Sequence, residues 1–96
     1  MHLVAFSVRD MKAEIFHQPF FCLTRGVGIR VFTEACGNLD HDFGKYPEDF
    51  VLFEVGKFDQ SRGVLDAFSA PTALGSGLDF QRPADNGSLK EVKRSA

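Results

Sequence analysis

The clearest apolar pattern lies near the start of the chain, where residues 3–8 read as a strand. Val4, Phe6 and Val8 point to one side of an extended chain, and the residues between them point to the other. β-branched and aromatic residues of this kind favour strands. We therefore expect a strand with at least one buried face.

Two shorter apolar segments follow this strand. Residues 13–16 are too few to distinguish a short strand from a helical turn. Pro19 biases the residue before it toward extended geometry and lacks an amide donor. The apolar residues 20–23 that come after it are therefore expected along the edge of the core, not in a central strand.

One helix is predicted over residues 25–36. Thr24 can accept a hydrogen bond from the first turn, and Gly37 suits a left-handed C-terminal cap. Gly26 and Gly28 weaken the first turns by about 1 kcal/mol each relative to alanine, so packing must hold this end, and another backbone can approach closely there. At about 100° per residue, one wide arc is apolar and the opposite arc is polar. The apolar arc holds Val27, Ile29, Val31, Phe32, Ala35 and Cys36.

The middle of the chain predicts a hairpin. Residues 38–45 are a polar loop, and residues 46–49 are a turn that leads into a strand over residues 50–58. Residues 59–63 have the length and the glycine of a hairpin loop, so residues 64–68 should return antiparallel.

The last part of the chain loses this regularity. Residues 71–77 are rich in small residues and are expected to be irregular, and residues 78–80 should add a last short edge strand. Apolar content then collapses, which predicts a flexible polar tail over residues 82–96. We expect a single α+β domain over residues 1–81, with one main helix packed on a small, mostly antiparallel sheet that ends in a C-terminal hairpin.

Composition and charge exclude several classes of function. Of the 96 residues, 44% are apolar and 11 are phenylalanine, so a core can form without disulfides or a structural metal. The formal net charge of −2 argues against the sequence-independent coating of nucleic acid that strongly basic proteins achieve. Any contact with DNA must therefore use a local basic patch.

Targeting signals are not evident in the sequence. The first six residues lack a basic leader and a long apolar core, and no apolar run approaches the ~20 residues needed to cross a bilayer. We expect a protein of a reduced cytoplasm with no membrane role.

Two cysteines and two histidines form a symmetrical series, His-x4-Cys-x13-Cys-x4-His, made by His17, Cys22, Cys36 and His41. All four side chains are of types that bind zinc, but the spacing matches no zinc-finger pattern. Each cysteine lies in an apolar context, where a free thiol behaves as a small hydrophobe. We interpret both as buried thiols and expect no metal.

No catalytic arrangement stands out either. The adjacent acids Glu48 and Asp49, and the pair Asp40 and Asp42, are typical of solvated turns and caps. The Gly26-x-Gly28 pair lacks the third glycine of a dinucleotide site. We expect no enzymatic activity and no cofactor.

Nucleic-acid binding is the one function with physical support from the residues alone. If the cations converge, arginines could contact phosphates while Tyr46, or an exposed Phe20 or Phe21, stacks on bases. The candidate residues are Arg9, Lys12, Arg25, Arg30, Lys45 and Tyr46. The alternative is that these cations are scattered and locally neutralised, with the phenylalanines in the core.

Three segments of the chain resemble one family. These are Tyr46-Pro47-Glu48-Asp49-Phe50, which runs through residues 51–59 to a turn ending at Gly63, the stretch Ser7 to Glu14, and Pro19-Phe20-Phe21. Over residues 3–80 the chain resembles the non-structural protein of gokushovirus-type microviruses, which are small phages with single-stranded DNA. It departs from that pattern at Gly26-Val27-Gly28-Ile29 and in the basic residues that follow Phe80.

The resemblance implies a non-enzymatic protein of the host bacterial cytoplasm that is absent from the mature virion. It implies a role in viral DNA replication or in the switch to genome packaging, by binding single-stranded DNA or the replication complex. The alternative is a protein-interaction module without DNA contact. Such a module could be a homodimer that pairs the exposed edge of residues 64–68 or 78–80.

Overall fold

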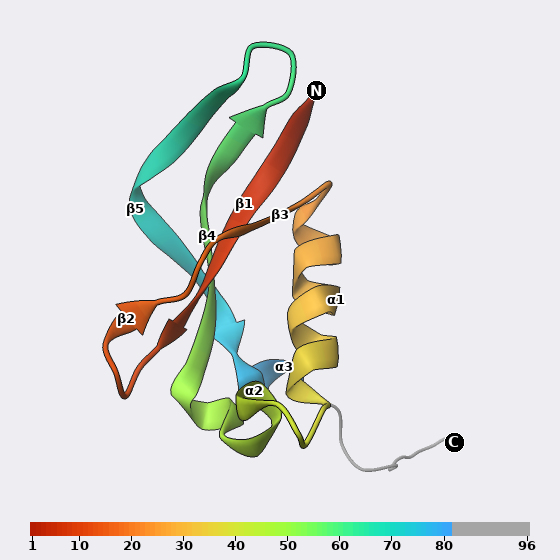
Figure 1. Ribbon diagram of the computed structural model, residues 1–96, viewed down its shortest axis with the longest axis vertical. Coiled ribbons are helices and arrows are strands. Elements are labelled where there is room, and N and C mark those ends of the chain that lie inside the picture. Colours follow the sequence, from red (N-terminus) through yellow and green to blue (C-terminus); the bar gives the residue numbers. More distant parts are fainter. Residues whose placement is uncertain (82–96) are drawn as a thin grey trace.

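The computed structural model describes residues 1–81 and shows an α+β fold in which one long helix lies beside a curled antiparallel sheet (Figure 1). This confirms the predicted fold class. The predicted tail over residues 82–96 lies outside the described residues. The strands are β1 (His2–Asp10), β2 (Ile15–Phe16), β3 (Phe20–Cys22), β4 (Phe50–Asp59) and β5 (Val64–Ser76). The helices are α1 (Arg25–Cys36), α2 (Asp42–Lys45), the 3₁₀ turn η1 (Pro47–Asp49) and α3 (Gly77–Phe80).

Strand β1 lies inside the sheet and organises it. It pairs antiparallel with β4 along its whole length, from His2 opposite Asp59 to Asp10 opposite Phe50. The other edge of β1 is shared by β3, near its start, and β2, near its end. Strand β5 pairs antiparallel with β4 on the far side, which confirms the predicted hairpin. The ambiguous segment 13–16 is a turn followed by the short strand β2.

Helix α1 covers one face of this sheet and closes the core. The buried core cluster consists of Phe6, Val8, Phe32, Cys36, Phe50 and Leu52. Ala5 on β1 is also buried. Gly28 faces Phe6, and a Cβ atom at Gly28 would overlap the Phe6 ring. The glycine therefore admits a side chain of the sheet, where the sequence suggested the approach of another backbone.

The predicted bounds of α1 are confirmed, and Thr24 caps it by accepting a hydrogen bond from the Val27 amide (3.2 Å). The predicted left-handed cap at Gly37 is wrong. Gly37 has φ −83° and donates to the carbonyls of Thr33 and Glu34, so the helix ends in a tightened right-handed turn. Val31 is 44% exposed because it lies about 100° around the helix from the buried Phe32. Within residues 1–81, no helix is both long and apolar enough to span a membrane.

Three predictions for the connections are wrong, each for a local reason. The polar loop over residues 38–45 contains α2, whose amide at Phe43 donates to Nδ1 of His41 (3.0 Å). Residues 71–76 are not irregular but continue β5. Residues 78–80 form α3 instead of an edge strand, because Ser76 caps this turn in a capping box.

Candidate nucleic-acid interface

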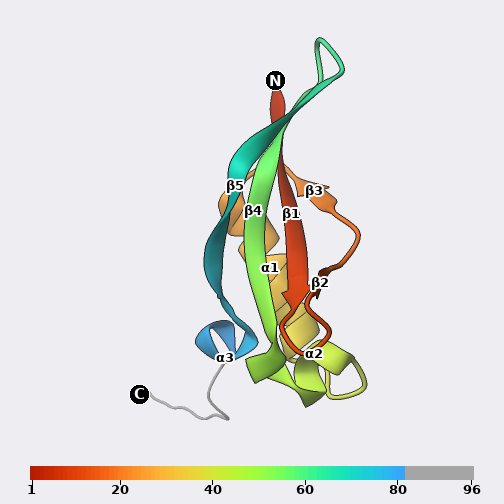
Figure 2. The same ribbon diagram turned by 90° about the vertical axis from the view of Figure 1, so that its left-hand side faces the viewer.

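The two faces of the sheet differ in what covers them. Residues directly opposite each other on paired strands project to the same side. On the side away from α1, Leu3 lies opposite Phe58 and Ser7 lies opposite Phe53. Figure 2 looks onto this side, with β1, β4 and β5 in front of α1. We call it the free face and define it by Leu3, Ala5, Ser7, Arg9, Phe16, Phe21, Val51, Phe53, Phe58, Leu65 and Ala73.

A β-bulge keeps this face apolar along the whole length of β4. Phe6 lies opposite Glu54 whereas Ala5 lies opposite Gly56, so Val55 is an extra residue on β4. The bulge reverses the alternation of β4. As a result Phe53 and Phe58, which are an odd number of residues apart, share the free face.

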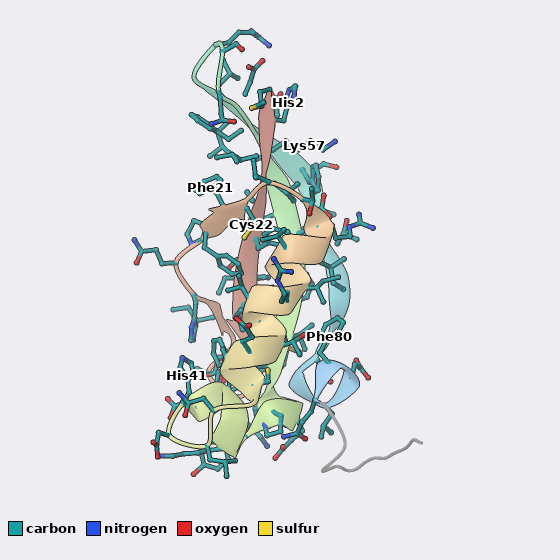
Figure 3. The ribbon with its side chains drawn as sticks, turned by 90° about the vertical axis from the view of Figure 1, so that its right-hand side faces the viewer. His2, Phe21, Cys22, His41, Lys57 and Phe80 are labelled. Carbon is teal, nitrogen blue, oxygen red and sulfur yellow. The ribbon has the colours of Figure 1, made fainter. Side chains whose placement is uncertain are left out.

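Phenylalanines form two pairs on the free face. Phe16 and Phe53 meet edge to face, with ring centroids 5.1 Å apart, and Phe21 and Phe58 meet in the same way at 6.1 Å. Phe16 is 37% exposed and Phe21 42% exposed. Figure 3 shows Phe21 on the outer side of β3, whereas Cys22 points toward α1.

The β2–β3 connection runs along the edge of β1 between these pairs (Figure 2). Ser7 on β1 is buried, and its Oγ donates to the carbonyl of His17 in this connection (2.7 Å). The free face therefore presents two separate aromatic stations: a lower one at Phe16 and Phe53, and an upper one at Phe21 and Phe58.

Charge is distributed unequally between the two faces. All four acidic residues in the strands pair with residues of the helix side, so they lie on that side of the sheet. They are Asp10, Glu54, Asp59 and Asp66. Of the two basic residues in the strands, Lys57 is on the helix side and Arg9 is on the free face. The free face therefore has no carboxylate at any strand position, although the chain as a whole is acidic.

Of the six predicted site residues, Arg9 lies on the free face. Its guanidinium lies over the Phe16 ring, 5.3 Å from the centroid. Its Nε is buried and has no hydrogen-bond partner among residues 1–81, where the guanidinium also makes no ion pair. This places a cation without a carboxylate partner beside the lower aromatic station.

Lys12, Lys45 and Tyr46 lie at the base of the molecule. Lys12 is exposed in the β1–β2 turn, which is joined to η1 because the Met11 amide donates to the carbonyl of Asp49 (2.8 Å). Lys45 ends α2, and Tyr46, 53% exposed, follows it. The structure thus brings the turn that carries Lys12 to the same end as Lys45 and Tyr46.

Arg25 and Arg30 lie on α1, on the other side of the sheet. Arg25 Nε is 2.7 Å from Oε1 of Glu54, a carboxylate that is buried in the core. Arg30 borders a hollow of about 870 Å³ along α1, and Glu34 borders the same hollow. The six predicted residues are therefore spread over three places, and Arg25 is engaged in neutralising a buried acid.

Comparison with known proteins adds one finding to this geometry. Residues 3–80 match the profile of the family described as Phage ORF5 protein. The chain belongs to the Phage ORF5 protein family. No curated protein and no solved structure matches it.

Both cysteines of this Phage ORF5 protein pack at the core, but the prediction of two buried thiols holds only for Cys36, because Cys22 is half-buried. Cys36 is fully buried in the core, and burial raises its pKa to about 11, so the thiol stays protonated at neutral pH. His17 packs against Phe43 and Phe50. Within residues 1–81, no three histidine, cysteine or acidic side chains are grouped as metal ligands.

Sequence reasoning found part of the aromatic surface of this family member and missed the rest. It named Phe20 and Phe21 as alternatives for stacking; Phe21 is exposed, while Phe20 stacks on Phe6 at the core (5.4 Å). Phe16, Phe53 and Phe58 were missed. The available signal was that residues 50–53 at the start of β4 are all apolar, which indicates that apolar side chains lie on both sides of this part of the strand.

Proposed function

We propose that this Phage ORF5 family protein binds the single-stranded DNA of a gokushovirus-type microvirus. It acts in genome replication or in the switch to packaging, and it catalyses no reaction. It works in the host bacterial cytoplasm and is not part of the mature virion. Membership of a phage protein family and the resemblance over residues 3–80 support this setting.

The free face is the observation that carries the proposal. Proteins that bind single strands commonly stack the bases on aromatic side chains of an open sheet. Here Phe16 and Phe21 are exposed on such a sheet, and each is braced by a second ring. Arg9 lies over one of these rings, where its charge can meet a phosphate.

The charge distribution makes this proposal compatible with an acidic protein. Residues 1–81 contain eleven of the 13 acidic residues but seven of the 11 basic ones, so general attraction to DNA is not expected. A strand lying on the free face would nevertheless meet no carboxylate from the sheet. Arg9 and Lys12 are the phosphate contacts that fit this surface, whereas Arg30, Lys45 and Tyr46 would require the strand to continue around the molecule.

The test is fluorescence anisotropy of a labelled single-stranded oligonucleotide at two salt concentrations, with a duplex as the comparison. We expect salt-sensitive binding that prefers the single strand. Arg9→Gln should weaken binding and reduce the salt slope by about 1. The matched control is Arg62→Gln in the exposed hairpin loop, which should leave both unchanged. Absence of binding at low salt would refute the proposed function.

The edge of β5 supports the alternative, a protein-interaction module that includes pairing with a second copy. Strand β5 is the outer strand of the sheet among the described residues, and only one of its 13 residues, Asp66, is charged. Edge strands usually carry charges that prevent pairing. Residues 64–68 keep this role as an available edge, whereas residues 78–80 lose it because they are helical.

Light scattering at several protein concentrations tests this alternative. A dimer that Leu65→Lys dissociates would support pairing through β5. A monomer at all concentrations would exclude the homodimer. An interaction module would then have to bind a different protein.

A further inference from the structure

The upper aromatic station borders a small, open hollow of about 240 Å³, lined by Leu3, Phe21 and Phe58. Each of these residues comes from a different strand, β1, β3 and β4. Pairing of β1 with both neighbours fixes them: Leu3 lies opposite Phe58, and Ala5 lies opposite Phe21. The hollow is thus a product of the sheet and does not depend on a loop.

We propose that this hollow is a slot for one unstacked nucleobase of single-stranded DNA. This inference rests on the proposed function and assigns its upper contact point. A flat aromatic base can lie against the exposed ring of Phe21 while Leu3 and Phe58 form the apolar floor. Because only apolar side chains line the slot, no side chain there reads the edge of the base, and binding is expected to tolerate any sequence.

The distance between the two stations sets a minimum length for the ligand. Phe53 and Phe58 are five residues apart on β4, which corresponds to roughly 15 Å along an extended strand. At about 3.4 Å per stacked nucleotide, this distance corresponds to between four and five steps, so a stacked strand of about five or six nucleotides connects the two stations. A dinucleotide should therefore bind much more weakly than an octanucleotide of the same base.

Charge favours DNA over a second copy of this chain as the occupant. The same free face carries Arg9, which makes no ion pair among residues 1–81, and has no strand carboxylate. A polyanion complements that arrangement. A second copy would place one Arg9 face against another without supplying an acid.

The chain contains no tryptophan, so one can be introduced as a unique probe. Phe21→Trp puts an indole at the slot, and Val31→Trp places one on the exposed side of α1 as the control. We expect addition of oligo-dT of eight nucleotides to quench the fluorescence of Phe21→Trp and to leave Val31→Trp unchanged. Affinity of Phe21→Trp should equal that of the native protein or exceed it, because indole stacks at least as well as phenyl.

Phe21→Leu supplies the complementary loss, since it keeps apolar bulk and removes the aromatic face. We expect about tenfold weaker binding of oligo-dT and no change for an oligonucleotide of abasic sites. The control is thermal unfolding of each variant, where a cooperative transition like that of the native protein indicates a retained fold.

The outcomes separate this inference from the proposed function. If the native protein binds oligo-dT but Phe21→Leu binds equally well and Phe21→Trp is not quenched, the slot assignment is overturned and DNA binding survives. If the native protein binds no oligonucleotide, both fall. A concentration-dependent blue shift of the Phe21→Trp emission in that case would identify the slot as a contact between copies.

Discussion

Both faces of the sheet carry large apolar side chains, but the two faces differ in how far these side chains are exposed to solvent. On the helix side, Phe6 and Leu52 are completely buried beneath α1. On the free face, Phe16 and Phe21 remain more than one third exposed. The same kind of residue thus holds the fold together on one side and is presented to the surroundings on the other.

Under the proposed function, this difference separates stability from recognition. Acidic residues on the helix side must be satisfied there, as Glu54 is by Arg25 at 2.7 Å. The free face carries no acidic strand residue, and Arg9, its one strand cation, makes no ion pair among residues 1–81, so changes on this face break no buried ion pair there. Stability should therefore depend on one face and ligand binding on the other.

Neighbouring residues of β4 give the strongest test of this separation. Leu52 is fully buried on the helix side, and Leu52→Ala should reduce the free energy of unfolding by about 3 kcal/mol through lost burial and a cavity. Phe53 is half-buried on the free face, so Phe53→Ala should cost about 1 kcal/mol. Urea unfolding followed by circular dichroism measures both.

Binding should show the reverse order for these variants. Under conditions where each is folded, Phe53→Ala should weaken single-stranded DNA binding several-fold and Leu52→Ala should not. Equal losses of stability, or a loss of binding confined to Leu52→Ala, would contradict the division between the faces.

Two glycines in α1 provide a second, smaller comparison. A Cβ atom at Gly28 would overlap the buried Phe6 ring, so Gly28→Ala should destabilise the protein by about 2 kcal/mol despite the better helix propensity of alanine. Gly26 has space, with Thr24 Oγ1 at 3.9 Å from such an atom. Gly26→Ala should stabilise by about 0.5 kcal/mol. If both variants shift the urea midpoint in the same direction, the close packing of α1 on β1 is refuted.

Local signals predicted the parts of the fold that depend on neighbours in sequence. Thr24 marked the start of α1, and alternation marked β1. The candidate site depends instead on which strands pair and where β4 bulges, which no local pattern encodes. Phe20 and Phe21 illustrate this, since adjacent strand residues point to opposite faces and only the pairing with β1 decides which ring enters the core. That the arginines lie on opposite sides of the sheet could not be predicted for the same reason.

The smallest expected effect concerns Asp59, which lies on the helix side at the hairpin end of the sheet. Burial alone would raise the pKa of Asp59. Its carboxylate, however, accepts hydrogen bonds from the backbone amides of Arg62 (3.2 Å) and Ser61 (2.9 Å). These hydrogen bonds, together with the charges of His2 and the N-terminus, lower the pKa below its ordinary value. A carboxyl with a lowered pKa stabilises the fold above its ordinary pKa of about 3.9, and this contribution is lost as pH falls through the lower value in the folded protein. Asp59→Asn should therefore be less stable than the native protein at pH 7, and the difference should shrink toward pH 2.5, where both side chains are neutral.

Urea unfolding of the two proteins between pH 7 and pH 2.5 measures this difference in stability, with matching circular dichroism spectra at pH 7 as the control for an intact fold. A difference that stays constant across this range would mean that the hairpin-end carboxylate adds nothing through its charge, and that the acids on the helix side are tolerated there without stabilising it.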